Sequence, residues 1–213
     1  MTQFFATYGA MLVKSVLVHA GYVAISVAIG FGLGLLFGVL LSRVPQYSGV
    51  ILPVLSIFQT IPGIVFIGIL FLFLGMVPAT AIIALAIYAI FPVLKNTYTG
   101  IVGVAPSFVE AAKGCGMSPM QTLLRVELPL AMPTIIAGLR MSTIYTVSWA
   151  VLTSMIGLGG LGDFIYQGVS SNNNTLIVAG AIPAAILAVV AGSLIDLLQK
   201  KVTPRGLQKE GRQ

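Results

Sequence analysis

The chain has 213 residues, of which 58% are hydrophobic and 8% charged, with a formal net charge of +6 at pH 7. Soluble domains carry about 25% charged residues, so this composition excludes an ordinary soluble fold. Cys115 and His19 are the only residues of their types, which excludes an internal disulfide, a thiolate metal cluster and a histidine-based metal site or triad. Several membrane spans fit this length and a separate soluble domain does not, so residues 1–213 are predicted to form a single transmembrane domain.

Five stretches are apolar enough to cross a membrane, since a spanning helix needs about 20 mostly apolar residues. Residues 3–18 mix apolar and polar side chains and fit either an interfacial helix or an added partial span. The sequence therefore predicts an all-α membrane protein with about five transmembrane helices, and six spans remain an alternative. The five stretches are 22–41, 50–74 with an interruption at Pro62-Gly63, 76–94, 130–156 and 176–195.

Basic residues gather after the first span, between the third and fourth spans, and in the tail 199–213. Five spans place all three groups on one side, which the positive-inside rule makes the cytoplasm. The N-terminus is then outside and the C-terminus inside. The tail is expected to act as a topology signal attracted to anionic lipid, and no nucleic-acid binding is expected because no aromatic residues interleave with its charges. The residues are Arg43; Lys95, Lys113 and Arg125; and Lys200, Lys201, Arg205, Lys209 and Arg212.

Small residues recur at four-residue spacing in the first and fifth spans. Such stripes let helix backbones approach closely in lipid, where helix association has no hydrophobic driving force. The contact they make is expected within the subunit, with contact to a second copy or paralogue as the alternative. The two stripes are Gly30, Gly34 and Gly38, and Ala184, Ala188 and Gly192.

The polar loop 96–129 lies between the third and fourth spans and is expected in the cytoplasm. Residues 110–113 favour a helix, and Gly114 and Gly116 are expected to end it. Gly116 is expected to permit the turn, and a Cβ atom there would be strained if its φ is positive.

A second short helix is expected at 120–128 in the same loop. Ser118 is placed to cap it, Pro119 suits its first position, and Pro129 is expected to halt it before the fourth span. Local physics thus predicts a helix, a sharp turn and a second helix, which is a shape suited to docking on another protein.

The fourth span carries Arg140, which costs about 2.5–3.5 kcal/mol at mid-membrane on insertion scales. It is expected either to snorkel to the interface or to face a pathway or gate. Asp196 is the acid of a neighbouring span, although it has a simpler partner in Lys200, four residues further on. Tyr145 and Trp149 share one helix face and serve either as packing or as a cation–π surface for a quaternary ammonium. The candidate pathway residues are Gln59, Asn96, Arg140, Tyr145 and Trp149.

The glycine-rich stretch 157–162 lacks the Gly-Lys-Ser/Thr ending of a phosphate-binding loop. It predicts a tight turn before a short amphipathic segment. The run Asn172-Asn173-Asn174 predicts an exposed polar turn.

The loop carries a pattern that can be compared with a known family. Glu110, Ala111 and Ala112 are followed by Gly116, then nine residues, then Glu-Leu-Pro at 127–129 preceded by Val126. This resembles the EAA loop of ABC importer permeases, with Val126 in place of the usual Ile. The stretches 58–63 (FQTIPG), 92–101 (PVLKNTYTGI) and 155–164 (MIGLGGLGDF) are similar to the osmoprotectant branch, which moves glycine betaine, carnitine and choline.

The resemblance implies a transport subunit of the bacterial cytoplasmic membrane, not an enzyme. Its implied partners are two ATP-binding subunits, a second permease subunit, an extracytoplasmic substrate-binding protein and membrane lipid. ATP and Mg²⁺ are expected in the ATPase, and no cofactor in this chain. The implied coupling contacts are Glu110, Ala111, Ala112 and Gly116. Open alternatives are another small zwitterion as substrate, a stand-alone secondary transporter, or a non-transporting scaffold.

Overall fold

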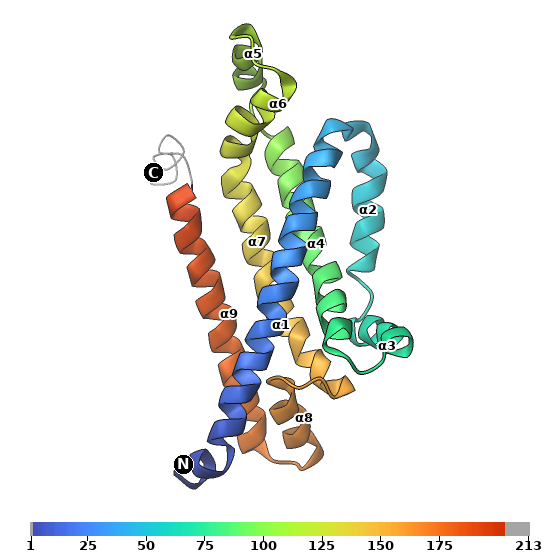
Figure 1. Cartoon of the computed structure of the whole chain (residues 1–213), viewed down its shortest axis with the longest axis vertical. Helices are drawn as coiled ribbons and strands as arrows, with labels where there is room; N and C mark the ends of the chain where they lie inside the picture. Colours follow the sequence, from blue (N-terminus) through green and yellow to red (C-terminus); the bar gives the residue numbers. More distant parts are fainter. Residues whose placement is uncertain (1, 203–213) are drawn as a thin grey trace.

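The computed structural model describes residues 2–202, and every regular element within them is helical (Figure 1). Four helices are long and apolar enough to cross a membrane, and a bent helix pair adds a fifth crossing when it is counted as one span. The all-α prediction is thus confirmed, while residues 203–213 of the predicted tail lie outside the described residues. The elements are α1 (Thr2–Arg43), a 3-10 turn (Pro45–Tyr47), α2 (Ser48–Phe58), α3 (Gly63–Leu74), α4 (Pro78–Val102), α5 (Pro106–Gly114), α6 (Pro119–Thr122), a π-helical turn (Leu123–Glu127), α7 (Leu128–Ala150), a 3-10 turn (Val151–Ile156), α8 (Gly162–Ser170) and α9 (Asn174–Val202).

Helix α1 is longer than the predicted span 22–41. Residues 3–18 continue the same helix, so the alternative of a partial span holds and a separate interfacial helix does not. The polar residues of this part are accommodated individually. His19 is fully buried and its Nε2 atom lies 3.0 Å from the Val147 carbonyl oxygen, whereas Lys14 is exposed.

The glycine stripe of α1 is the contact surface for α4. A Cβ atom built on Gly30, Gly34 or Gly38 would lie only 2.4–2.7 Å from the nearest α4 atoms. The α4 residues met are Ala89, Val93 and Thr97, which share the same four-residue spacing. The predicted role in packing within the subunit is therefore confirmed. Hydroxyls add bonds between helices, since Ser26 donates to the Ile82 carbonyl and Ser142 to that of Ala89.

The second crossing breaks where Pro62-Gly63 predicts an interruption. Helices α2 and α3 meet at an angle of 82°. Proline lacks a backbone N–H and restricts the residue before it, so a regular helix does not continue through this point. Two bonds involving Tyr88 of α4 hold the break: its hydroxyl donates to the Ile61 carbonyl, and its own carbonyl accepts from the Gln59 side chain.

The chain returns at the end opposite α5 through a tight glycine turn, as the stretch 157–162 predicts. Gly157, Gly159 and Gly160 have φ of +75°, +78° and +110°, and the short helix α8 follows them. The exposed turn predicted at the three asparagines is also present, with Asn172 at φ +52°.

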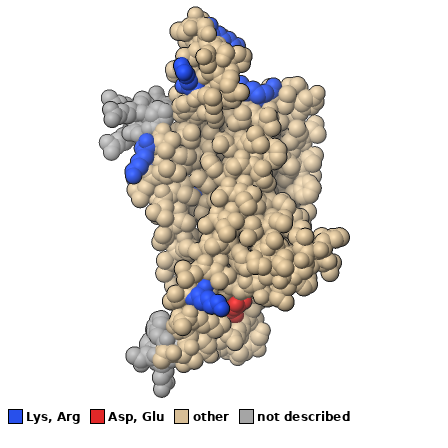
Figure 2. Space-filling model, in the orientation of Figure 1, with Lys and Arg blue, Asp and Glu red and all other residues tan. Residues whose placement is uncertain are grey.

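The chain passes back and forth so that α5, α6 and the last residues of α9 point toward one end and the N-terminus lies at the other (Figure 1). On the displayed face, charged side chains gather toward the two ends and leave the middle uncharged (Figure 2). This is the distribution required of a protein whose middle is surrounded by hydrocarbon.

Candidate functional site

The turn after α5 is built by the glycine of the EAA pattern. The Gly116 N–H donates to the Lys113 carbonyl and the Met117 N–H to the Ala112 carbonyl, which are the two bonds of a Schellman motif. Gly116 has φ +78°, so the condition under which a Cβ atom would be strained is met. The four-residue spacing from Ala112 to Gly116 therefore matches the spacing that a Schellman motif requires at the end of this helix.

Helix α6 follows at once and is capped as predicted. The Ser118 hydroxyl accepts from the Gln121 N–H at 3.3 Å, and the Gln121 side chain accepts from the Ser118 N–H at 2.8 Å. This reciprocal capping box satisfies two backbone donors at the start of the helix. With Pro119 at the first helical position, the direction of α6 is fixed locally.

The prediction that Pro129 halts the second helix is wrong. The chain continues from α6 through the π-helical turn into α7, so Pro119–Ile156 forms one long helical stretch. In the π-turn the Leu128 N–H bonds to the Leu123 carbonyl, five residues back. Pro129 sits in the first turn of α7, where its missing N–H disturbs the widened ladder little.

An ion pair fastens this turn to α1. The two guanidinium Nη atoms of Arg43 donate to the two carboxylate oxygens of Glu127, in a fork-to-fork arrangement. Glu127 is only 7% exposed, so its charge depends on this partner. The base of the α5–α6 element is thus anchored to the neighbouring helix.

The tip of the element presents the predicted coupling residues unequally. Glu110, Ala111 and Gly116 are exposed, whereas Ala112 is buried. Sequence reasoning missed three exposed apolar side chains here, Phe108, Met120 and Leu124, which are 54%, 61% and 57% exposed. Large apolar residues within a charged loop were the signal that could have found them. Together with Glu110 they form a mixed acidic and apolar surface suited to a protein partner.

The membrane-embedded part shows two kinds of exposed helix face. The exposed faces of α1 and α9 are almost entirely aliphatic or phenylalanine, as expected of a surface toward lipid. The exposed stripe of α7 differs, because it combines the apolar Met141 with small, polar and amphipathic residues. Its members are Ala137, Met141, Tyr145 and Ser148.

Arg140 lies beside this stripe and pairs with Asp196 of α9. The Arg140 Nε atom is 2.7 Å from Asp196 Oδ1, and the side chains are 45% and 43% exposed. The simpler partner expected for Asp196, Lys200, is therefore replaced by a partner on another helix. Arg140 and Tyr145 also line one cavity of about 340 Å³, together with Ala137, Met141, Ile144 and Gln199.

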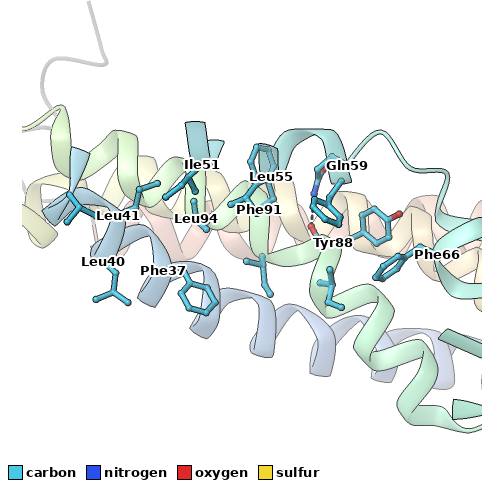
Figure 3. Close-up of a pocket in the computed structure, with 14 residues that line it drawn as sticks. Phe37, Leu40, Leu41, Ile51, Leu55, Gln59, Phe66, Tyr88, Phe91 and Leu94 are labelled. Atoms are coloured by element: carbon cyan, nitrogen blue, oxygen red, sulfur yellow. Dashed lines mark hydrogen bonds between the residues drawn. The ribbon is translucent and has the colours of Figure 1, made fainter. Parts of the chain in front are cut away.

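Trp149 and Gln59 lie elsewhere, at the break between α2 and α3. The Trp149 ring packs on Tyr88 with a centroid distance of 4.1 Å and covers Gly63, where a Cβ atom would lie 2.2 Å from the indole. Gln59 borders an apolar groove of about 550 Å³ between α1, α2 and α4 (Figure 3). Its side-chain amide donates to the Tyr88 carbonyl at 3.0 Å, within a lining that is otherwise nearly all apolar.

Asn96 occupies a third position, on α4 where α7 crosses it. Its amide donates to the Pro92 carbonyl at 2.8 Å, and a Cβ atom on Gly138 of α7 would lie 2.6 Å from Asn96 Cβ. The structure thus divides the five candidate pathway residues, with Arg140 and Tyr145 at one cavity, Gln59 and Trp149 around Tyr88, and Asn96 apart from both. Asn96 to Val102, the first part of the expected loop 96–129, is helical.

Residues 30–206 match the family described as binding-protein-dependent transport system inner membrane component. The chain belongs to this family. It is a membrane transport component, and the basic residues Arg43, Lys113, Arg125, Lys200 and Lys201, which lie toward its α5 end, mark that end as cytoplasmic.

Curated relatives align with nearly the whole chain. The choline transport system permease protein OpuBB of Bacillus subtilis (strain 168) is 40% identical over 209 residues, covering 98% of this chain and 96% of that protein. The glycine betaine/carnitine/choline transport system permease protein OpuCB of the same organism is 39% identical over 208 residues, covering 98% and 96%. The carnitine transport permease protein OpuCB of Listeria monocytogenes is 37% identical over 209 residues, again covering 98% and 96%.

A solved structure shares the fold. The MetNI methionine ABC transporter, in an inward-facing conformation, has a chain that matches with a TM-score of 0.80 at 24% identity, covering 91% of this chain and 96% of that one. The all-helical importer-permease fold is therefore shown.

Proposed function

We propose that this permease forms the membrane path for a quaternary-ammonium osmoprotectant, with glycine betaine, choline and carnitine as its candidate substrates. The observation that carries the proposal is the full-length similarity to permeases named for these three compounds. The exposed stripe of α7, which includes Tyr145 and lies beside Arg140, supports a path at that surface.

The α5–α6 element is the proposed docking site for a separate ATP-binding subunit, which uses ATP and Mg²⁺. Glu110 and Ala111 present an acid and a small side chain, and the exposed Phe108, Met120 and Leu124 add apolar surface that docking would bury. Ala112 and Gly116 contribute differently. The Ala112 side chain packs inward and its carbonyl accepts a Schellman bond, while Gly116 permits the turn.

The proposed complex holds two permease subunits, identical or paralogous, and two ATP-binding subunits, with an extracytoplasmic binding protein that delivers the substrate. ATP binding closes the ATPase pair and moves the docked elements, so the permease pair changes between inward-facing and outward-facing states. Differential contacts in the two states are what allow ATP to shift this equilibrium.

Uptake in proteoliposomes tests the proposal. The chain is reconstituted with its ATPase and binding protein, and uptake of radiolabelled glycine betaine, choline and carnitine is measured with and without ATP. ATP-dependent uptake of at least one compound is the expected result. Uptake without the ATPase would instead identify a secondary transporter. ATP-dependent activity that moves none of the three would leave another small zwitterion as the substrate.

A further inference from the structure

The cavity beside α7 and α9 is lined by Arg140, whose Nε atom lies 2.7 Å from Asp196 Oδ1 of α9. The side chains of Arg140 and Asp196 are nearly half exposed, so the pair is not sealed into a packed core. Asp196 precedes Lys200 of the cytoplasmic end by four residues, about 6 Å along α9 at 1.5 Å per residue, so the pair lies on the cytoplasmic side of the apolar region. An ionisable residue within a spanning helix is a candidate functional residue.

We propose that this cavity is a binding subsite for a zwitterion, in which Arg140 receives the carboxylate and the cationic end lies against Tyr145. The inference rests on the proposed function and goes beyond it, because it names a chemical class and the residues that select it.

The Arg140 guanidinium has donors to spare for a ligand. Its Nε atom faces Asp196, and among the described residues no hydrogen bond from its two Nη groups is found. Planar guanidinium groups bind carboxylates through two parallel N–H donors, so these groups suit a ligand carboxylate. Gly192 of α9 lies beside the guanidinium, since a Cβ atom built there would lie 3.9 Å from Nε and Nη2, an ordinary van der Waals distance.

Charge balance favours a zwitterion over a simple ion. The Arg140–Asp196 pair is neutral as a unit, so a ligand with no net charge leaves the site neutral, whereas an anion or a cation would add a net charge to it. Tyr145 is 47% exposed and lines the same cavity, so its ring can face a quaternary ammonium. The cavity volume of about 340 Å³ lies within the range of small-molecule sites.

The test measures equilibrium binding of radiolabelled glycine betaine to the permease–ATPase complex in nanodiscs, with the binding protein left out. Choline is the matched competitor, since it has the same trimethylammonium group and a hydroxyl in place of the carboxylate. The wild-type complex is expected to bind glycine betaine saturably. Arg140→Gln is expected to weaken that binding roughly tenfold to hundredfold, as for loss of a charged hydrogen-bonded partner, and to change choline competition less than about threefold, with Arg140→Lys intermediate.

Asp196→Asn separates ligand binding from a structural ion pair. It leaves Arg140 in place and removes a competing carboxylate, so glycine betaine binding should be kept or tightened. An ion pair that only stabilises the fold would make the two single variants equally harmful. Two controls test assembly. The first is co-purification of the ATPase with each variant, and the second is the Arg140→Gln/Asp196→Asn double variant, which restores neutrality.

The outcomes separate this subsite from the transport function. Absence of saturable wild-type binding, or equal losses for glycine betaine and choline in Arg140→Gln, would overturn the subsite even if ATP-dependent uptake is intact. Absence of wild-type uptake for every quaternary-ammonium compound would remove the proposed function, and the subsite with it.

Discussion

Substituting Gly116 tests how the turn of the α5–α6 element contributes to coupling. Gly116 has φ +78°, and a Cβ atom built there meets nothing within 4 Å. A side chain at this position therefore causes no clash, and its cost comes from the backbone alone. The left-handed conformation costs an L-residue roughly 1–2 kcal/mol. Asparagine tolerates it better, and a β-branched residue tolerates it worst.

Gly114 provides a matched control two residues away. Its Cβ position is equally open, but the residue ends α5 without a positive φ. Alanine in a helix is more stable than glycine by roughly 0.5–1 kcal/mol, so Gly114→Ala should preserve or strengthen the element. The two substitutions add the same methyl group to the same short segment and differ only in the backbone conformation they meet.

The expected effect is measured as ATP-dependent uptake and as the ATPase recovered with the purified permease. A cost of 1–2 kcal/mol changes a conformational equilibrium by a factor of roughly 5–30. Coupling should then fall in the order wild type, Gly116→Asn, Gly116→Ala, Gly116→Val, with Gly114→Ala at the wild-type level. Full activity of Gly116→Val, or an equal loss in Gly114→Ala, would refute the assignment of this turn as the determinant of docking geometry.

Three further predictions concern stability, read as thermal unfolding of the purified protein in detergent. Gly34→Ala places a Cβ atom 2.7 Å from an α4 carbonyl oxygen and should lower the free energy of unfolding by about 1–3 kcal/mol. Gly32→Ala is the control, since a Cβ atom there has nothing within 4 Å and should not destabilise the protein. Equal melting temperatures of the two variants would contradict close packing of α1 on α4. Glu127→Gln should lower the free energy of unfolding by about 1.5–3 kcal/mol, and by less when Arg43→Gln is already present. Strictly additive losses in the double variant would exclude a stabilising ion pair between the two residues. Burial raises the pKa of Asp163, in α8 outside the spanning helices, above its ordinary 3.8. The contribution of this carboxyl to folding stability is therefore fully present below the unfolded-state pKa and is lost as pH rises through the folded-state pKa. Asp163→Asn should flatten this pH dependence of the melting temperature between pH 3 and 7, and parallel pH profiles of variant and wild type would contradict the prediction.

Features that depend on residues close in sequence were predictable. The break at Pro62-Gly63 and the positive φ of Gly116 follow from backbone rules that act within a few residues. The Ser118 cap is predicted for the same reason. The π-turn before α7 was not predicted, because a proline normally signals a helix boundary and the wider ladder that admits Pro129 has no local sequence signature.

Features that depend on which helix faces which were beyond the sequence. Tyr145 and Trp149 share a helix face by spacing, yet Trp149 packs on Tyr88 while Tyr145 lines a cavity. Asp196 has a plausible partner four residues away in sequence, but the arrangement of α7 and α9 gives it Arg140 instead. Periodicity identifies a face of a helix, and only the packed neighbours decide what that face does.

The continuity of α6 with α7 connects the docking surface to the proposed pathway. The helical stretch Pro119–Ile156 carries Met120 and Leu124 at its start and Arg140 and Tyr145 in its middle. A displacement of α6 by a docked ATPase would therefore be transmitted along this helix without crossing a flexible loop. The π-turn and Pro133 of α7 interrupt the regular backbone hydrogen bonding on this route, and the Arg43–Glu127 pair ties the π-turn to α1. A helix that pivots at this turn would move Arg140 relative to Asp196 on α9, which changes the two charges a zwitterion meets. Docking and substrate binding would then be linked through one helical stretch that is held to α1 at the π-turn.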